Sequence, residues 1–333
     1  MRLLNAYKIQ CSNNRIRTSH IYIEMKDSKK QNQTLIYTNM VIAGGSMKSL
    51  SAIGCITYLE ERGLISSIKN FVGTSAGSII SLFVVLGYTA KEMVRFIVEH
   101  IKKDDMSSLN VDDIFNVFET YGLSMGKNLE HLVSAIIHNK LKVKDLSFIE
   151  LAKNTGRNLI VCVSNITQER EEFWCLESTP QLSVVKAIRT SCSLPILFSP
   201  IRHNDDLYID GGLFNNFPID YFKGDSPLKD IIGINISATS PKDTNDFMQY
   251  ISLILNIVTK QLTKSYKNDI QNNVVTLELE DEGWISLNDM KISVPKEVLE
   301  RYIYAGYVKM KDLIEKHEEL RIKTLTSNSL QSE

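Results

Sequence analysis

The chain has 333 residues, of which 43% are hydrophobic and 23% charged, a composition typical of a globular protein with a sizeable buried core. The 38 Lys and Arg residues nearly balance the 39 Asp and Glu residues, so the formal net charge of −1 excludes an overall basic field of the kind that attracts nucleic acid. The longest apolar stretch, 79–86, is far shorter than the roughly 20 residues of a membrane-spanning helix, and the amino-terminal segment has no apolar run of signal-peptide length. We therefore expect a soluble, cytoplasmic protein.

Cysteine and histidine spacing gives no sign of a metal site. No CxxC pair occurs, and the six histidines show no regular ligand spacing. An odd number of cysteines within apolar stretches predicts buried thiols in a reducing compartment. The sequence therefore predicts neither a metal nor a cofactor. The five cysteines are Cys11, Cys55, Cys162, Cys175 and Cys192.

The first elements after the polar amino-terminal segment alternate between strand and helix. A short apolar strand lies within 37–45 and ends in two glycines, and the helix-forming stretch 47–63 follows, with a glycine as its carboxyl-terminal stop. A second strand is predicted within 68–77. The stretch 78–87 is apolar on all sides, which predicts a helix buried in the core.

Strand–helix–strand–helix within about 50 residues is typical of a parallel sheet with helices packed on its faces. We therefore expect an α/β fold in one domain spanning 37–320, preceded by a polar arm, 1–36, and followed by a polar tail, 321–333. Further strands are predicted at 159–164, 207–212, 231–237 and 274–279, and further helices around 111–121, 127–139, 244–263 and 296–318.

One predicted helix permits two interpretations. Apolar residues recur at three-to-four spacing between 247 and 262, which indicates an amphipathic helix. The favoured interpretation is a surface helix whose apolar face packs on the core. The alternative, an apolar face that lies on a membrane, is weakened because the polar side carries few Lys or Arg residues. Transient contact with a membrane surface stays open on this basis.

The stretch "FVGTSAGSIISLFVV" places Ser75 between two glycines at a spacing of two. A sharp turn from a strand into a helix points one side chain outward, and glycines on either side remove the Cβ atoms that would clash in such a bend. Gly73, Thr74, Ser75, Ala76 and Gly77 fit this turn, a nucleophile elbow. Ser75 would lie at a helix amino terminus, where free N–H groups favour developing negative charge.

The stretch "AGGSMKS" ends the neighbouring strand, so its backbone N–H groups should face the same end of the sheet as Ser75. Such N–H groups can bind the oxyanion formed in acyl transfer.

The same stretch does not fit a nucleotide-binding P-loop, because the two positions that must be glycine in a P-loop are Ile42 and Met47. The predicted oxyanion loop is Gly44, Gly45, Ser46, Met47, Lys48 and Ser49.

The candidate base is Asp210 in "DLYIDGGLFNNFP", at the end of a predicted strand and before Gly211 and Gly212. Histidine is the usual partner of a nucleophilic serine. The only histidine after Asp210 is His317, which lies among charged residues typical of a solvated helix face. His203 precedes the acid in a predicted loop. No histidine therefore has the sequence context of a catalytic base.

These features together resemble the patatin-like phospholipases. The resemblance covers roughly 38–310 and is carried by the glycine-rich loop, "VGTSAGSIISLFVVLGYT", "VVKAIRTSCSLPILFSPI" and "YIDGGLFNNFP" in the same order. It implies a three-layer α/β fold with a mostly parallel central sheet. It also implies a Ser–Asp dyad, with Ser75 as nucleophile, Asp210 as base and the loop from Gly44 to Ser49 as oxyanion hole, acting on a lipid or phospholipid.

The glycine-rich loop departs from the family's usual Gly-Gly-Gly-x-Arg-Gly. Ser46 and Ser49 replace glycines, and Lys48 keeps the positive charge of the arginine but loses its forked guanidinium. Two functions follow from the sequence. The first is a lipid acyl hydrolase, of phospholipase A or lysophospholipase type. The alternative is a catalytically weak or inactive protein of this fold that binds lipid or a protein partner.

Overall fold

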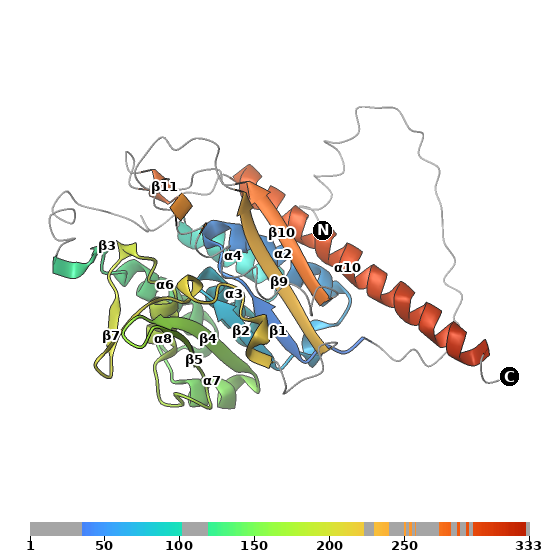
Figure 1. Cartoon of the computed structure of the whole chain (residues 1–333), viewed down its shortest axis with the longest axis horizontal. Helices are drawn as coiled ribbons and strands as arrows, with labels where there is room; N and C mark the ends of the chain where they lie inside the picture. The colour runs from blue at the N-terminus through green and yellow to red at the C-terminus, as the bar shows by residue number, and fades with distance from the viewer. Residues whose placement is uncertain are drawn as a thin grey trace. The chain divides into compact units, whose positions relative to one another are not determined.

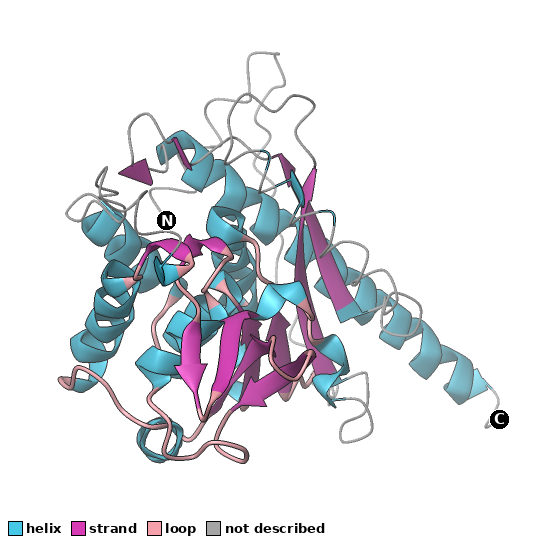
Figure 2. Ribbon diagram, turned by 60° about the vertical axis from the view of Figure 1, so that its left-hand side comes forward, coloured by secondary structure: helices cyan, strands magenta, loops and turns pink. Residues whose placement is uncertain are grey.

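The computed structural model describes residues 35–101, 119–222, 230–239, 273–280 and 296–330, together with 250, 253–254, 257, 285–286 and 291–292. Within these residues an eight-stranded sheet forms the centre of the unit that begins at Leu35. Its strand order is β10-β9-β1-β2-β4-β8-β7, with β5 also paired to β4. Helices flank the sheet, so the protein has the expected α/β architecture (Figure 1, Figure 2).

Five neighbouring strands of this sheet are parallel: β10 (Val274–Glu280), β9 (Ile231–Thr239), β1 (Asn39–Ile42), β2 (Asn70–Thr74) and β4 (Asn158–Asn165). The strands β5 (Arg170–Trp174), β8 (Asp206–Asp210) and β7 (Ile201–His203) complete the sheet with antiparallel pairings. All six strands that the sequence predicted are present, each shifted at its ends by a few residues. Their apolar runs are buried on both faces, as a parallel sheet requires.

A ladder of three asparagines joins the parallel strands at their amino ends. Asn39, Asn70 and Asn158 lie opposite one another on β1, β2 and β4. The Asn70 Nδ2 donates to Asn39 Oδ1 at 2.8 Å, and the Asn158 Nδ2 donates to Asn70 Oδ1 at 2.9 Å. The ladder lies at the amino ends of these strands, whereas β2 ends at Thr74, at the opposite end of the sheet.

The helices between the strands begin and end close to their predicted positions. The predicted helix 47–63 consists of a short 3₁₀ helix, η1 (Ser46–Leu50), and α2 (Ser51–Glu61), and Gly63 has a φ of +68°, as its role as a stop requires. The predicted helix 78–87 is α3 (Ala76–Val85), and its residues from Ile80 to Val85 are buried as expected.

The carboxyl-terminal helix α10 (Lys296–Leu330) packs along α2 (Figure 1). Two glycines allow the close approach: a Cβ on Gly54 would lie 1.8 Å from the Ile303 carbonyl oxygen, and one on Gly306 would lie 1.9 Å from that of Ser51. The helix extends past its predicted end at 318, to Leu330.

Three further helices were not predicted: α4 (Ala90–Ile101), α7 (Phe148–Thr155) and α8 (Val184–Ser191). The predicted helix 127–139 is α6 (Lys127–Leu141). Three predicted segments lie almost entirely outside the described residues: the arm 1–36 and the helices 111–121 and 244–263. Four short strands are described outside the main sheet: β3 (Gly122–Ser124), β6 (Ile196–Phe198), β11 (Ile285–Ser286) and β12 (Lys291–Ile292). The four cysteines within the described ranges, Cys55, Cys162, Cys175 and Cys192, are buried free thiols, as predicted.

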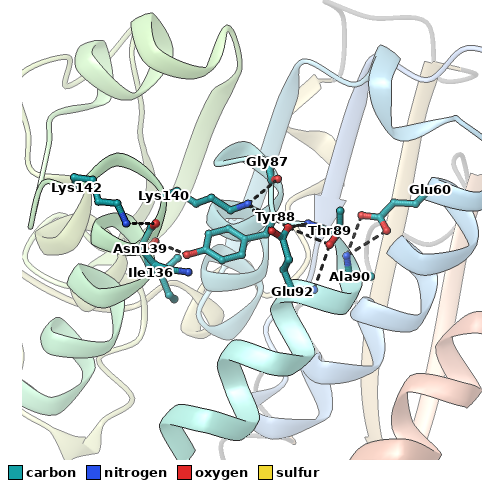
Figure 3. Close-up of polar contacts among 10 residues, drawn as sticks. All are labelled: Glu60, Gly87, Tyr88, Thr89, Ala90, Glu92, Ile136, Asn139, Lys140 and Lys142. Atoms are coloured by element: carbon teal, nitrogen blue, oxygen red, sulfur yellow. Dashed lines mark hydrogen bonds and ion pairs between the residues drawn. The ribbon is translucent and has the colours of Figure 1, made fainter. Parts of the chain in front are cut away.

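A polar network joins three helices around the start of α4 (Figure 3). Lys140 of α6 forms an ion pair with Glu92 of α4 at 3.0 Å. The Tyr88 hydroxyl donates to the Ile136 carbonyl at 2.7 Å, and Glu60 of α2 accepts a hydrogen bond from the Ala90 N–H. These contacts hold α2 and α6 against the turn that follows α3.

Among the described residues, no helix has the length and apolar character needed to cross a bilayer.

Candidate active site

Strand β4 brings the two predicted catalytic residues together. Thr74, the last residue of β2, pairs with Cys162 of β4, and Asp210, the last residue of β8, pairs with Val163. Strand β5 occupies one edge of β4, so β2 and β8 both pair with the other edge. Strand β2 is parallel to β4 and β8 is antiparallel to it, so β2 and β8 run toward each other. Their carboxyl ends therefore meet, and Ser75 follows directly from one of them.

Ser75 adopts a strained backbone conformation at the junction of β2 and α3. Its φ of 51° and ψ of −129° are rarely occupied by a residue with a Cβ atom. The flanking glycines make the bend feasible: a Cβ on Gly73 would lie 2.5 Å from the Ser78 Cα, and one on Gly77 would lie 2.4 Å from the Ile42 carbonyl oxygen. The chain therefore turns sharply from β2 into α3 at Ser75.

Two serine hydroxyl groups hold this turn. The Ser75 N–H donates to Ser191 Oγ at 2.8 Å, and the Ser191 hydroxyl donates to the Cys162 carbonyl at 2.6 Å. The Ser78 hydroxyl donates to the Ser75 carbonyl at 2.6 Å. Both backbone polar groups of Ser75 are therefore bound, while its half-buried side chain stays at the tip of the turn.

Asp210 is buried, with 3% of its surface exposed, and its Oδ1 accepts the Gly212 N–H at 2.8 Å. Burial raises the pKa of Asp210 to about 6, while the Ser75 hydroxyl and the Gly212 N–H, which approach the carboxylate as donors, act in the opposite direction. Its Oδ2 makes no hydrogen bond of regular geometry within the described part of the chain.

The glycine-rich loop follows β1 and lies beside the elbow, because Ile42 pairs with Gly73. A Cβ added to Gly44 would lie 3.2 Å from the Ser75 Cβ. The Gly44 N–H donates to the Asn216 carbonyl and the Lys48 N–H donates to the Gly45 carbonyl. Within the described residues, no hydrogen bond is made by the N–H groups of Gly45, Ser46 and Met47.

The six residues of the loop differ in exposure. Ser46 is exposed and has a φ of 50°, so this serine occupies a conformation that glycine adopts freely. Gly45 and Met47 are half-buried, whereas Lys48 and Ser49 turn into the protein and are 6% and 1% exposed. The side chains of Lys48 and Ser49 therefore lie on the inner side of η1.

The two histidines considered as alternative bases lie away from this edge of the sheet. His203 pairs with Asp206 on the β7–β8 hairpin, so Asp210 is four residues farther along β8, or about 13 Å. His317 bonds to the Tyr37 hydroxyl at 2.8 Å, and Tyr37 precedes the amino end of β1. His317 therefore lies toward the opposite end of the strands from Ser75.

Sequence reasoning did not assign roles to Ser191 or Asn216, although both lie in stretches that carried the resemblance. Asn216 Nδ2 donates to the Gly44 carbonyl at 3.1 Å, and Ser191 binds the elbow. The only available signal was their position inside "TSCSLP" and "NNFP", which does not show what they contact.

A serine on a sharp strand-to-helix turn, near a buried aspartate and a loop with unbonded N–H groups, is an arrangement typical of α/β hydrolases. Residues 40–223 match the family model of the patatin-like phospholipases. The chain belongs to the patatin-like phospholipase family, a family of lipid hydrolases, as the resemblance in its motifs implied.

Parts of the chain are also similar to individual proteins. The chain is 32% identical over 186 residues to the "Probable lipid hydrolase 463L" of Invertebrate iridescent virus 6. The matched region covers 55% of this chain and 62% of that relative. It is 26% identical over 266 residues to the uncharacterized protein YqhO of Bacillus subtilis, covering 74% of this chain and 89% of the relative. A solved structure, VipD from Legionella pneumophila, is similar at 18% identity with a TM-score of 0.48, covering 84% of this chain and 67% of that one.

Proposed function

We propose that the protein is a serine lipid acyl hydrolase in which Ser75 is the nucleophile and Asp210 the general base. The observation that carries this proposal is the meeting of the strained Ser75 elbow with a buried carboxylate at the junction of β2, β4 and β8. A normal carboxylate, with a pKa of about 3.9, is a weak base toward a serine hydroxyl. Burial of Asp210 raises its pKa to about 6 and so makes it a stronger one.

In the first step, Asp210 accepts the proton of Ser75 while Ser75 Oγ attacks the ester carbonyl. The resulting tetrahedral oxyanion collapses, and the alcohol leaves with the proton returned by Asp210. In the second step, Asp210 takes a proton from water as the water attacks the acyl-enzyme. The second tetrahedral intermediate then collapses, the fatty acid leaves, and Asp210 returns the proton to Ser75 Oγ. General-base help of this kind is worth about 10²–10⁴-fold in rate.

The N–H groups of Gly45, Ser46 and Met47 supply the candidate oxyanion hole, since those of Gly44 and Lys48 are already bound. Gly45→Val tests this assignment. A Cβ at Gly45 would lie 2.7 Å from the Ile236 side chain, so the larger residue should displace the loop and lower kcat with little change in KM. A normal kcat with a changed KM would assign the loop to substrate binding instead.

The proposed substrates are carboxylic esters of lipids, with phospholipids and lysophospholipids as the first candidates. Family membership supports this class. Covalent labelling of the full chain by a fluorophosphonate, with Ser75→Ala as control, tests the nucleophile, because only an activated serine reacts. A panel of phospholipids, lysophospholipids and neutral glycerides then tests the substrate class.

The alternative is a protein of the same fold that binds lipid without turnover. The replacement of two loop glycines by Ser46 and Ser49 favours this alternative, because it narrows the conformations open to the loop. Absence of labelling at Ser75, together with binding of the same lipids in vesicles, would support it.

A further inference from the structure

One residue binds both backbone groups of the first loop glycine. The Gly44 N–H donates to the Asn216 carbonyl at 3.1 Å, and the Asn216 Nδ2 donates to the Gly44 carbonyl at 3.1 Å. Asn216 lies six residues after Asp210, in the loop that follows the acid motif. The pair of bonds therefore joins the glycine-rich loop to the acid loop.

The amide of Asn216 is wedged between two glycines. A Cβ on Gly44 would lie 2.4 Å from Asn216 Oδ1, and a Cβ on Gly212 would lie 2.8 Å from the same atom. Gly212 is also the residue whose N–H binds the Asp210 carboxylate. A Cβ at Gly44 or at Gly212 would therefore displace the Asn216 amide from its present position.

The glycine-rich loop has few other tethers at this point. Its preceding residue, Ala43, is held by the Ile234 carbonyl of β9, and η1 begins at Ser46. In the described part of the chain, Asn216 provides the hydrogen bonds that hold Gly44 between these two anchors. The distance from the free N–H groups of Gly45 and Ser46 to Ser75 therefore depends on Asn216.

We propose that Asn216 is a positioning residue, which sets the oxyanion loop against the Ser75–Asp210 pair without touching substrate. The inference rests on the proposed function. A displacement of the donors by about 1 Å is enough to lower the rate substantially, because their bonds to the oxyanion exist only in the transition state. Loss of the Asn216 amide should therefore lower kcat and leave KM nearly unchanged.

The test compares Asn216→Ala and Asn216→Asp with a matched control, Asn158→Ala, in the full chain. Asn158 is also half-buried and its Nδ2 also donates one hydrogen bond, at 2.9 Å, but to Asn70 at the other end of the strands. We expect kcat on a short-chain ester to fall about 10- to 100-fold in Asn216→Ala, with KM within twofold. Asn216→Asp keeps the shape but turns a carboxylate oxygen toward the Gly44 carbonyl, so it should fall further. Asn158→Ala should keep its kcat.

Hydrogen exchange gives a second measurement that needs no activity. The Gly44 amide should exchange faster in Asn216→Ala than in the wild type or in Asn158→Ala, because its loop loses a tether. A kcat within twofold of the wild type, or unchanged exchange at Gly44, would overturn the proposal. If the wild type hydrolyses no ester, the proposed function fails, and the exchange rates still decide whether Asn216 holds the loop.

Discussion

The hydroxyl of Ser191 lies between the Ser75 N–H, which donates to it at 2.8 Å, and the Cys162 carbonyl, to which it donates at 2.6 Å. One buried side chain thus ties the nucleophile elbow to the central strand β4 and satisfies a donor and an acceptor at once. The strained conformation of Ser75 persists only if its surroundings hold it, and Ser191 is one of these supports.

Ser191→Ala should lower both stability and activity. Two buried backbone groups lose their partner, which costs about 1–3 kcal/mol of unfolding free energy. Release of the elbow should also lower kcat, since the position of Ser75 Oγ is no longer fixed. Denaturant unfolding and ester hydrolysis measure the two effects. Thr190→Val is the control: Thr190 is buried on the same helix, and its hydroxyl bonds to the Lys186 carbonyl, not to the elbow. Equal kcat values in the two variants would contradict the role of Ser191.

Asp210→Asn should abolish hydrolysis almost as completely as Ser75→Ala, because the pair acts as a unit. In the wild type, kcat/KM should rise with pH through about 6, the pKa of Asp210, since only the ionised carboxylate accepts a proton. His203→Ala and His317→Ala should retain most of their activity, given that neither lies near Asp210. A loss above about 10³-fold in either histidine variant, the size expected for a lost base, would replace the dyad by a triad.

The same pKa predicts a change in stability with pH. The folded-state pKa of Asp210 lies above its unfolded value, so the folded protein binds more protons between about pH 4 and pH 6. The stabilisation of the folded state by this proton binding is fully present below about pH 4 and is lost as the pH rises through about 6. Asp210→Asn, which carries no charge at any pH, should therefore be more stable than the wild type at pH 8 by about 2–3 kcal/mol, and the gap should close toward pH 4. A gap that does not vary with pH would contradict the burial of a charged Asp210.

The positions of Ser75 and Asp210 in the fold could be predicted from the sequence because their local patterns are strong. Glycines around Ser75 and after Asp210, each at the end of an apolar strand, indicate sharp turns at one edge of the sheet. The supports could not be predicted in this way. Ser191 acts on a residue 116 positions away in the chain, and Asn216 acts on one 172 positions away, so their roles depend on the completed fold.

The missed secondary structure has different causes. Helix α7 carries a capping box, in which Ser147 and Glu150 bind each other's backbone N–H groups, and a closing glycine, Gly156, so it was predictable from known signals. Strand β5 reads "REEFW" and has no apolar alternation. Pairing with β4 makes it a strand, which is a tertiary effect that its own residues do not indicate.

Ser49→Ala should stabilise the protein. Ser49 is 1% exposed, and its Oγ has no hydrogen-bond partner in the described part of the chain. Removing this hydroxyl removes the free-energy cost of burying an unbonded polar group and loses only a few van der Waals contacts. A gain of about 1 kcal/mol is expected in the unfolding free energy. Ser51→Ala is the matched control, because Ser51 is equally buried but donates to the Lys48 carbonyl at 2.6 Å. It should lose stability; a loss in Ser49→Ala as well would mean that a bound water satisfies its hydroxyl.

Ser46→Gly tests whether the departure of this loop from the family pattern matters for catalysis. Ser46 has a φ of 50°, a region that costs a residue with a Cβ about 1 kcal/mol or more, whereas glycine adopts it freely. The loop therefore already has a conformation suited to glycine, and its Ser46 N–H is free to bind an oxyanion. We expect the substitution to change stability by about 1 kcal/mol or less, since relief of strain is opposed by the greater freedom of the unfolded chain, and to leave kcat within about threefold.

Glu169→Gly is the control for this last prediction. Glu169 has nearly the same φ, 52°, in the turn between β4 and β5. This turn follows the end of β4 at Asn165, beyond the residues of β4 that pair with Thr74 and Asp210. The two variants should change stability by similar amounts and both should keep their activity. A kcat that rises more than about tenfold in Ser46→Gly alone would show that the serine restricts the loop during turnover, and would favour a catalytically weak protein. An unchanged kcat would mean that the backbone of the loop, and not the identity of its third residue, determines how well it stabilises the oxyanion.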